Sequence, residues 1–167
     1  MSMIGEYARV TPAELDRALR DPEWALKLVQ GRMEAEAAGG PDPAPARCLD
    51  IDKAWSAIGF LLRRAAFPVD VVHGEHDVPD ADDWGYGPPR YLTPAQVRTA
   101  AEALAEIPAE RLTDGVGPED LAAAEIYPTI VWERGEPLDY VCEHYEQLRP
   151  FFRAAADEGD AVLLWLG

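Results

Sequence analysis

The sequence predicts an α/β fold, with a helix-rich α+β arrangement as the alternative, in which helices cover both faces of a small mixed sheet. One observation is the run A-V-L-L-W-L at Ala161–Leu166, which is apolar throughout and has the length of a strand. A strand of this kind is covered on both faces, so we expect it inside the sheet. The other is a series of segments whose apolar residues recur at steps of three and four, the helical spacing.

The size of the chain fits this class. Its 167 residues are enough for one domain spanning residues 1–167 that buries about two-thirds of its unfolded surface. The hydrophobic content of 48% and the five tryptophans are typical of a packed globule rather than a disordered chain.

The most sharply patterned stretch is Cys48–Leu62. Apolar residues at helical spacing predict a helix from about Asp50 to near Ala66, with Trp55 on its buried face and in the centre of the core. Asp50 is placed to cap the first turn by accepting a backbone N–H near Lys53. Asp52 would lie in the positive end of the helix dipole. For both aspartates we favour capping over catalysis.

Two further helices start with the same cap chemistry. Thr11-Pro-Ala-Glu14 and Thr93-Pro-Ala-Gln96 each place threonine before proline, with a Glu or Gln three residues later, which predicts a capping box. The remaining predicted helices follow proline or an Asp-Pro or Gly-Pro pair: Pro22–Ala37, Pro118 to about Glu125, and Pro137 to about Glu158, with a kink at Pro150.

The other strands and loops follow from local composition. Met3–Val10 alternates loosely and Val69–His73 is rich in β-branched residues, so both are predicted strands. Tyr127-Pro128 predicts extended backbone. Glycine and proline mark Gly39–Ala46 as a surface loop. Gly74–Arg90 is a long polar loop, and loops above about 12 residues in compact domains are often functional.

The charge balance limits the classes of partner. Fifteen basic and 31 acidic residues give a net charge of −16, which predicts no nucleic-acid and no membrane partner and would favour a basic protein partner. There is no signal-peptide pattern and no apolar run of about 18 residues, so a cytoplasmic location is expected. Cys48 and Cys142 are then expected to be reduced, buried thiols.

Several motifs, in order along the chain, resemble the YfbM-like family of small bacterial proteins of unknown function. They are Met1–Gly5, Leu49–Trp55 (L-D-I-D-K-A-W), Gly74–His76, Glu125–Pro128 and the final apolar strand. The resemblance implies one α/β domain and no particular activity. Members of that family often carry histidine at position 59 and Thr-Gly at positions 63–64, where this chain has Gly59 and Arg63-Arg64, so chemistry that needs that histidine is not expected here.

Four polar residues form the first candidate site: Asp50, Asp52, Glu75 and His76. Imidazole and carboxylate groups can bind metal or act as acid and base. However, no second pair of ligands at diagnostic spacing is visible, so no metal or other cofactor is predicted and a turn-fixing role is favoured for Glu75 and His76.

The second candidate site is an interaction loop that contains Trp84, Tyr86, Arg90 and Tyr91, since aromatic residues and arginine are enriched at binding hot spots. Two hypotheses on function follow, and whether the chain is an enzyme stays open. The first is a non-catalytic acidic module that binds a basic protein. The second is a small-ligand-binding protein or a metal-dependent hydrolytic enzyme that uses the Asp50/Asp52 and Glu75/His76 groups in one cleft.

Overall fold

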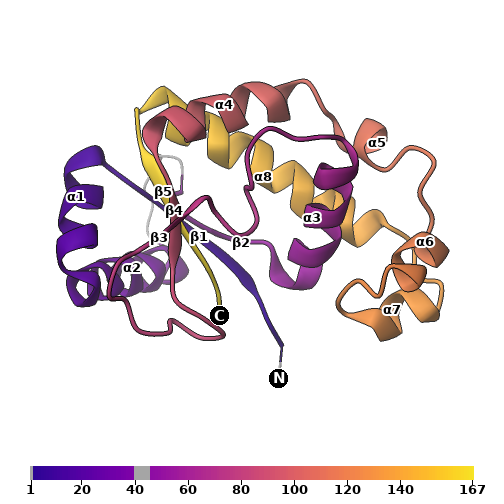
Figure 1. The fold of residues 1–167 in the computed structure, drawn as a ribbon, viewed down its shortest axis with the longest axis horizontal. Helices are drawn as coiled ribbons and strands as arrows, with labels where there is room; N and C mark the ends of the chain where they lie inside the picture. The colour runs from indigo at the N-terminus through magenta and orange to yellow at the C-terminus, as the bar shows by residue number, and fades with distance from the viewer. Residues whose placement is uncertain (1, 40–45) are drawn as a thin grey trace.

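The computed structural model describes residues 2–39 and 46–167, and most of the predicted Gly39–Ala46 loop lies outside them. Its strands form one five-stranded sheet in the order β2-β1-β5-β4-β3 (Figure 1). They are β1 (Gly5–Val10), β2 (Cys48–Asp50), β3 (His76–Asp77), β4 (Arg90–Leu92) and β5 (Ala161–Leu166). The apolar C-terminal strand β5 lies in the centre, as predicted.

The α/β class is confirmed, and one detail of the prediction is wrong. Every pairing between the described strands is antiparallel, whereas a mixed sheet was expected. The longest pairing joins β1 to β5 over six residues each, from Gly5 opposite Leu166 to Val10 opposite Ala161. Because the two long strands are antiparallel, the first and last residues of the chain's ordered strands meet at the same end of the sheet.

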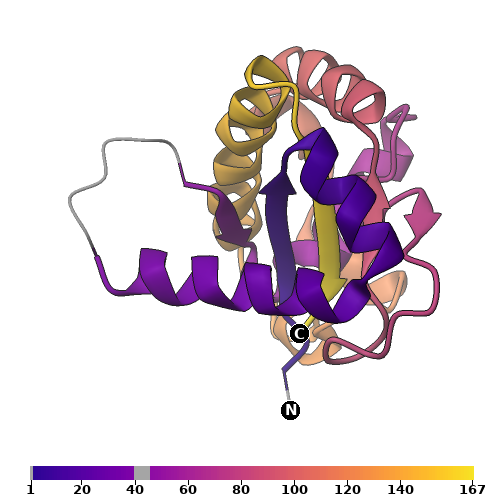
Figure 2. The same ribbon diagram turned by 90° about the vertical axis from the view of Figure 1, so that its left-hand side faces the viewer.

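Helices cover both faces of the sheet. They are α1 (Pro12–Arg20), α2 (Pro22–Ala37), the 3-10 helix η1 (Asp52–Ala54), α3 (Trp55–Arg64), α4 (Pro94–Ala105), α5 (Ala109–Leu112), α6 (Pro118–Ala123), α7 (Thr129–Glu133) and α8 (Asp139–Asp157). In Figure 2, α1 and α2 lie in front of the sheet, and α4 and α8 lie behind or beside it.

Alternating residues of β1 and β5 divide the core into two parts. Ala8, Val10 and Leu163 pack with residues of α1 and α2. Tyr7 and Leu164 pack with α3, α4 and α8 in the larger part. This is the pattern that a strand apolar on both faces requires.

The predicted helix starts are confirmed where the cap is local. The side chains of Thr11 and Thr93 each accept a hydrogen bond from the backbone N–H three residues later. The side chains of Glu14 and Gln96 in turn accept from the backbone N–H of Thr11 and Thr93. The helix α8 continues through Pro150, and its buried stripe includes Val141, Tyr145 and Leu148. Pro128 has the extended backbone that the sequence predicted, and the short helix α7, which was not predicted, begins directly after it.

The start of the central helix differs from the prediction. Asp50 ends strand β2, and its side chain accepts from the backbone N–H of Asp52 at 3.2 Å instead of capping near Lys53. The helix follows only after the turn of η1. Trp55 is half-buried rather than central: its indole Nε1 donates to the carbonyl of Met3 at 2.9 Å, and its ring stacks on Tyr127.

Val69–His73 is a turn and not a strand. Asp70 Oδ1 accepts from the backbone N–H groups of Val72 and His73 at 3.1 and 2.8 Å. A side chain that binds its own neighbouring backbone competes with strand pairing, which explains why the β-branched pattern was misleading. The valines are nevertheless buried in the core.

Candidate functional site

A cavity of about 530 Å³ lies where η1, α7 and the start of α8 meet, and we call it the α7–α8 cavity. Ligand sites typically fall in the range of about 300–1,000 Å³, so its size is suitable for a side chain or a small molecule. Its lining residues are Asp52, Lys53, Pro128, Val131, Trp132, Arg134, Glu136, Pro137, Asp139, Tyr140 and Glu143.

Tyr140 joins two walls of this cavity. Its hydroxyl donates to Asp52 Oδ2 at 2.6 Å and accepts from the backbone N–H of Lys53 at 3.0 Å. Burial raises the pKa of Tyr140, and the hydrogen bond to Asp52 raises it further, so the phenol stays protonated. The hydroxyl therefore fixes η1 to the first turn of α8.

Asp52 has a left-handed backbone, with φ +49°, a conformation that aspartate tolerates better than most residues. Its neighbour Asp50 is exposed and lies opposite Glu6 on β1. Burial raises the pKa of the Glu6 carboxyl to about 7, with a further contribution from Asp50. The two aspartates of the motif therefore have different surroundings: Asp52 lines the cavity, and Asp50 faces Glu6 across the strand pair.

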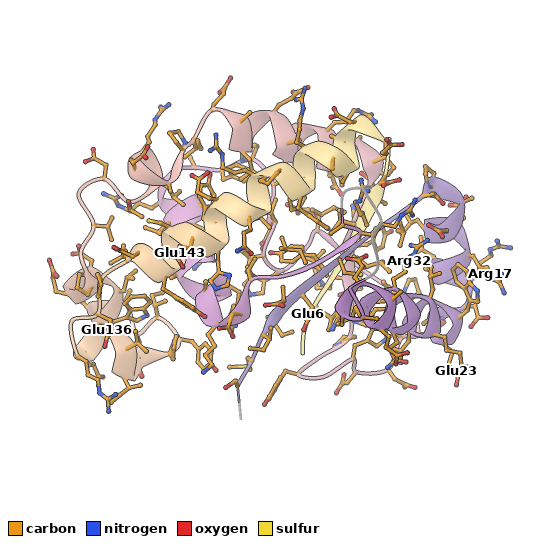
Figure 3. The ribbon with its side chains drawn as sticks, turned by 180° about the vertical axis from the view of Figure 1, so that it is seen from behind. Glu6, Arg17, Glu23, Arg32, Glu136 and Glu143 are labelled. Carbon is orange, nitrogen blue, oxygen red and sulfur yellow. The ribbon has the colours of Figure 1, made fainter. Side chains whose placement is uncertain are left out.

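The rim of the cavity is acidic. Glu136, Asp139 and Glu143 are exposed, and within residues 2–39 and 46–167 no side chain pairs with any of the three. Figure 3 shows Glu136 and Glu143 at the same end of the molecule, opposite the end that carries Arg17, Glu23 and Arg32. Lys53 and Arg134 also line the cavity, so acidic lining residues outnumber basic ones by four to two.

Trp132 is the most deeply buried residue of the lining. The residue is 2% exposed, and its indole Nε1 has no hydrogen-bond partner among the residues that the structure describes. A buried N–H without an acceptor is unfavourable by about 1–3 kcal/mol. An unpaired buried donor of this kind needs an explanation.

Glu75 and His76 do not line this cavity. Glu75 Oε1 accepts from the backbone N–H of Asp70 at 2.8 Å, which closes the turn that replaced the predicted strand. Burial alone would raise the pKa of the Asp70 carboxyl, but hydrogen bonds from the side chain and backbone of His73 and from Val72 outweigh it and lower that pKa to about 2. Glu75 is therefore part of a hydrogen-bonded turn, the role that the sequence favoured.

His76 lies on strand β3, opposite Tyr91 on β4, and the two rings stack with centroids 5.0 Å apart. The next pair along the same strands is Asp77 with Arg90, which forms an ion pair. Arg90 also donates to the carbonyls of His73 and Gly74. This network fixes β3 and β4 at the edge of the sheet.

The aromatic part of the interaction loop folds back onto the sheet. Trp84 packs edge-to-face on Trp165 of β5, and the backbone N–H of Tyr86 donates to the carbonyl of Leu166 at 2.8 Å. Tyr86 is 44% exposed and is the most open of the four predicted interaction residues. It lines a second cavity, of about 310 Å³, together with Arg90 and His73.

A metal site and a membrane-spanning helix are not found in the part of the chain that the structure describes. No group of three or more His, Cys, Asp or Glu side chains is arranged to hold a metal ion. None of the described helices combines the length and apolar character needed to cross a membrane.

A family model described as a domain of unknown function, DUF1877, matches residues 1–165. The chain belongs to the DUF1877 family. The crystal structure of YfbM from Escherichia coli, a protein of unknown function, is similar to this DUF1877 chain with a TM-score of 0.63 and 20% identity, over 99% of this chain and 100% of that chain. At this identity the likeness shows the fold alone. The predicted resemblance to YfbM-like proteins is confirmed, and no curated protein matches the chain.

Most residues of the α7–α8 cavity in this DUF1877 protein were not among the sequence candidates, which included only Asp52. Tyr140 and Asp52 are 88 positions apart in the sequence, so no local pattern connects them. The closest signal was the charged, proline-containing stretch before α8, where Glu136, Pro137 and Asp139 come together. It resembled an ordinary helix start.

Proposed function

We propose that the protein is a non-catalytic binding module that engages a basic protein partner through its acidic surface. The observation that carries the proposal is the set of unpaired carboxylates on the rim of the α7–α8 cavity, in a chain with a net charge of −16. Charge of one sign around a cavity attracts partners of the other sign and accelerates their association.

The environment of the other candidate residues supports binding rather than catalysis. Glu75 is hydrogen-bonded within its own turn, and His76 is stacked against Tyr91. A general acid or base must be within hydrogen-bonding reach of a reacting group, and these side chains line neither of the two cavities described above.

Capture from a lysate of the protein's own cells tests the proposal. The immobilised chain is incubated at about 50 mM salt, where charge interactions act over longer distances, and is then washed at about 500 mM. We expect a basic protein to be retained at low salt, released at high salt, and to bind with defined stoichiometry when purified and titrated by calorimetry. If no basic protein is retained at low salt and released at high salt, the proposal is wrong.

A second candidate function is supported by the Asp52–Tyr140 pair, which places a carboxylate and a phenol in one cavity wall. This arrangement suits a small ligand. Of the Asp50/Asp52 and Glu75/His76 groups that were expected in one cleft, only Asp52 lines this cavity, so the second candidate is a small-ligand-binding protein that uses Asp52 and Tyr140. Native mass spectrometry of protein freshly purified from its own cells tests it. A retained small molecule or metal would favour this function, and a mass equal to that of the chain alone would count against it.

A further inference from the structure

We propose that the α7–α8 cavity receives a lysine or arginine side chain from a segment of the basic partner. This inference rests on the proposed function and identifies the site and the chemistry that would be recognised. Three features of the cavity support it: its apolar floor, its acidic rim and a buried hydrogen-bond donor.

The floor suits an aliphatic chain. Pro128, Val131, Trp132 and Pro137 supply apolar surface, and Trp132 is almost fully buried. Lysine and arginine bury the methylene part of their side chains against surfaces of this kind while the charged group stays near water. The half-buried Tyr140 adds an aromatic ring, and cations bind favourably on the faces of such rings.

The rim suits a cation. Glu136, Asp139 and Glu143 are exposed and unpaired in the described parts of the chain, whereas Asp52 is held by Tyr140. Lys53 and Arg134 are the basic residues of the lining, so its charged groups sum to −2 when all six are ionised. Three carboxylates without partners can move to meet an ammonium or guanidinium group without breaking an existing ion pair.

The buried donor favours a peptide over a free amine. The indole N–H of Trp132 has no acceptor within residues 2–39 and 46–167; the residue belongs to the cavity lining, but the nitrogen itself is closed to solvent. A peptide segment brings backbone carbonyl oxygens as well as a cationic side chain, whereas a simple polyamine offers no such acceptor. A peptide whose carbonyl displaces the side chains over this nitrogen would satisfy both the rim and the donor.

The direct test uses lysine with both backbone ends capped, N-acetyl-lysine amide, titrated into the full chain and followed by NMR of the assigned tryptophan indole signals. We expect the signal of Trp132 to move in a saturable manner with a dissociation constant in the millimolar range, about 4 kcal/mol of binding free energy. N-acetyl-norleucine amide, which has the same aliphatic chain without the charge, should bind at least about tenfold more weakly.

Two triple variants distinguish binding at the rim carboxylates from a general attraction to the negative charge of the protein. Glu136→Gln, Asp139→Asn and Glu143→Gln together should weaken binding of the lysine probe at least about tenfold. The matched control neutralises Asp16, Glu23 and Glu102, which are exposed and distant in the sequence from the lining, and changes the net charge by the same +3. It should change the dissociation constant by less than about twofold.

Three results would overturn the inference: no shift of the Trp132 signal at saturating probe, equal binding of the norleucine probe, or equal weakening by the two triple variants. The captured partner gives an independent readout. If it binds the rim variant as tightly as the wild type, this site is wrong while the proposed function stands. If no partner is captured but the probe binds as expected, the proposed function fails and the site stands.

Discussion

The segment from Asp70 to Asp77, together with Arg90, and the α7–α8 cavity are both rich in charged groups, but their side chains are used differently. In the first region Glu75, Asp70 and Arg90 are bound to backbone or to a counter-charge. On the cavity rim three carboxylates are unpaired in the described chain. The comparison shows that a high density of charged residues does not by itself mark a binding site, because hydrogen bonds made within the fold leave little capacity for a ligand.

If this comparison is correct, changes in the first region should cost stability, and changes on the rim should cost binding alone. The largest effect is expected for Gly74→Ala. Gly74 has φ +84°, and an added Cβ would lie 3.0 Å from Cβ of Arg90 and 3.1 Å from Leu164. Strain and overpacking should lower the free energy of unfolding by about 2–4 kcal/mol, measured by chemical denaturation.

Gly31→Ala is the matched control for that variant. Gly31 lies inside helix α2, with no atom within 4 Å of the added Cβ. Alanine should stabilise the protein there by about 0.5–1 kcal/mol. Equal effects of the two substitutions would show that the turn at position 74 does not require glycine.

Glu6→Gln measures what an unpaired but half-buried carboxylate costs. The folded-state pKa of about 7 is above the ordinary 4.5, so folding favours the protonated carboxyl. Its contribution to the free energy of unfolding is fully present below about pH 4.5 and is lost as the pH rises through about 7. After allowance for solvent contact, glutamine should stabilise the protein by about 1–2 kcal/mol at pH 8 and flatten the profile. A wild-type stability curve that is flat between pH 4.5 and 7 would contradict the burial of this group.

Tyr140→Phe tests the connection between η1 and α8. The variant removes the donor to Asp52 and the acceptor of the Lys53 N–H, and it should cost about 1–1.5 kcal/mol in thermal or chemical unfolding. Tyr86→Phe is the control, because the Tyr86 ring is exposed and its hydroxyl has no partner in the described chain. A loss of the same size in both variants would contradict a structural role of the Tyr140 hydroxyl.

Asp70→Asn should have a smaller, pH-dependent effect. The folded-state pKa of about 2 is below the ordinary 3.8, so the carboxylate stabilises the fold above about pH 3.8, and this contribution is lost as the pH falls through about 2. Because the side chain is 45% exposed, we expect only about 1 kcal/mol at pH 6. The unfolding free energies of wild type and variant should converge as the pH is lowered from 6 to 2. If the two pH profiles instead run parallel, the ionised Asp70 carboxylate does not stabilise the turn.

The smallest effect on stability is expected for the rim triple variant, Glu136→Gln, Asp139→Asn and Glu143→Gln. Surface substitutions without partners usually stay within about 0.5 kcal/mol each. The unfolding midpoint should therefore match that of the Asp16, Glu23 and Glu102 control. A large loss of stability would mean that these carboxylates are structural, as those of Asp70 and Glu75 are, and the contrast between the two regions would disappear.

The predictable parts of the fold depend on short-range chemistry. The capping boxes at Thr11 and Thr93, and the buried strand Ala161–Leu166, follow from neighbouring residues and were predicted correctly. The helices α5 and α7, with four and five residues, are too short for a periodic pattern to be visible. Val69–His73 was mistaken for a strand because the Asp70 side chain, rather than the β-branched residues, decides the backbone.

The candidate site was less predictable for a physical reason. The cavity depends on contacts between residues far apart in the sequence, such as Tyr140 with Asp52 and with the backbone of Lys53. Whether a carboxylate is available for a ligand depends on partners that only the fold provides. Asp52 lines the cavity, but no pattern in the sequence distinguished it from Asp50 or Glu75.

The two ends of the ordered chain are joined by a reciprocal pair of hydrogen bonds between Ile4 and Gly167, each 2.8 Å long. In Figure 1 the marked termini lie close together. A short linker could therefore connect them into a circular backbone without disturbing the β1–β5 pairing.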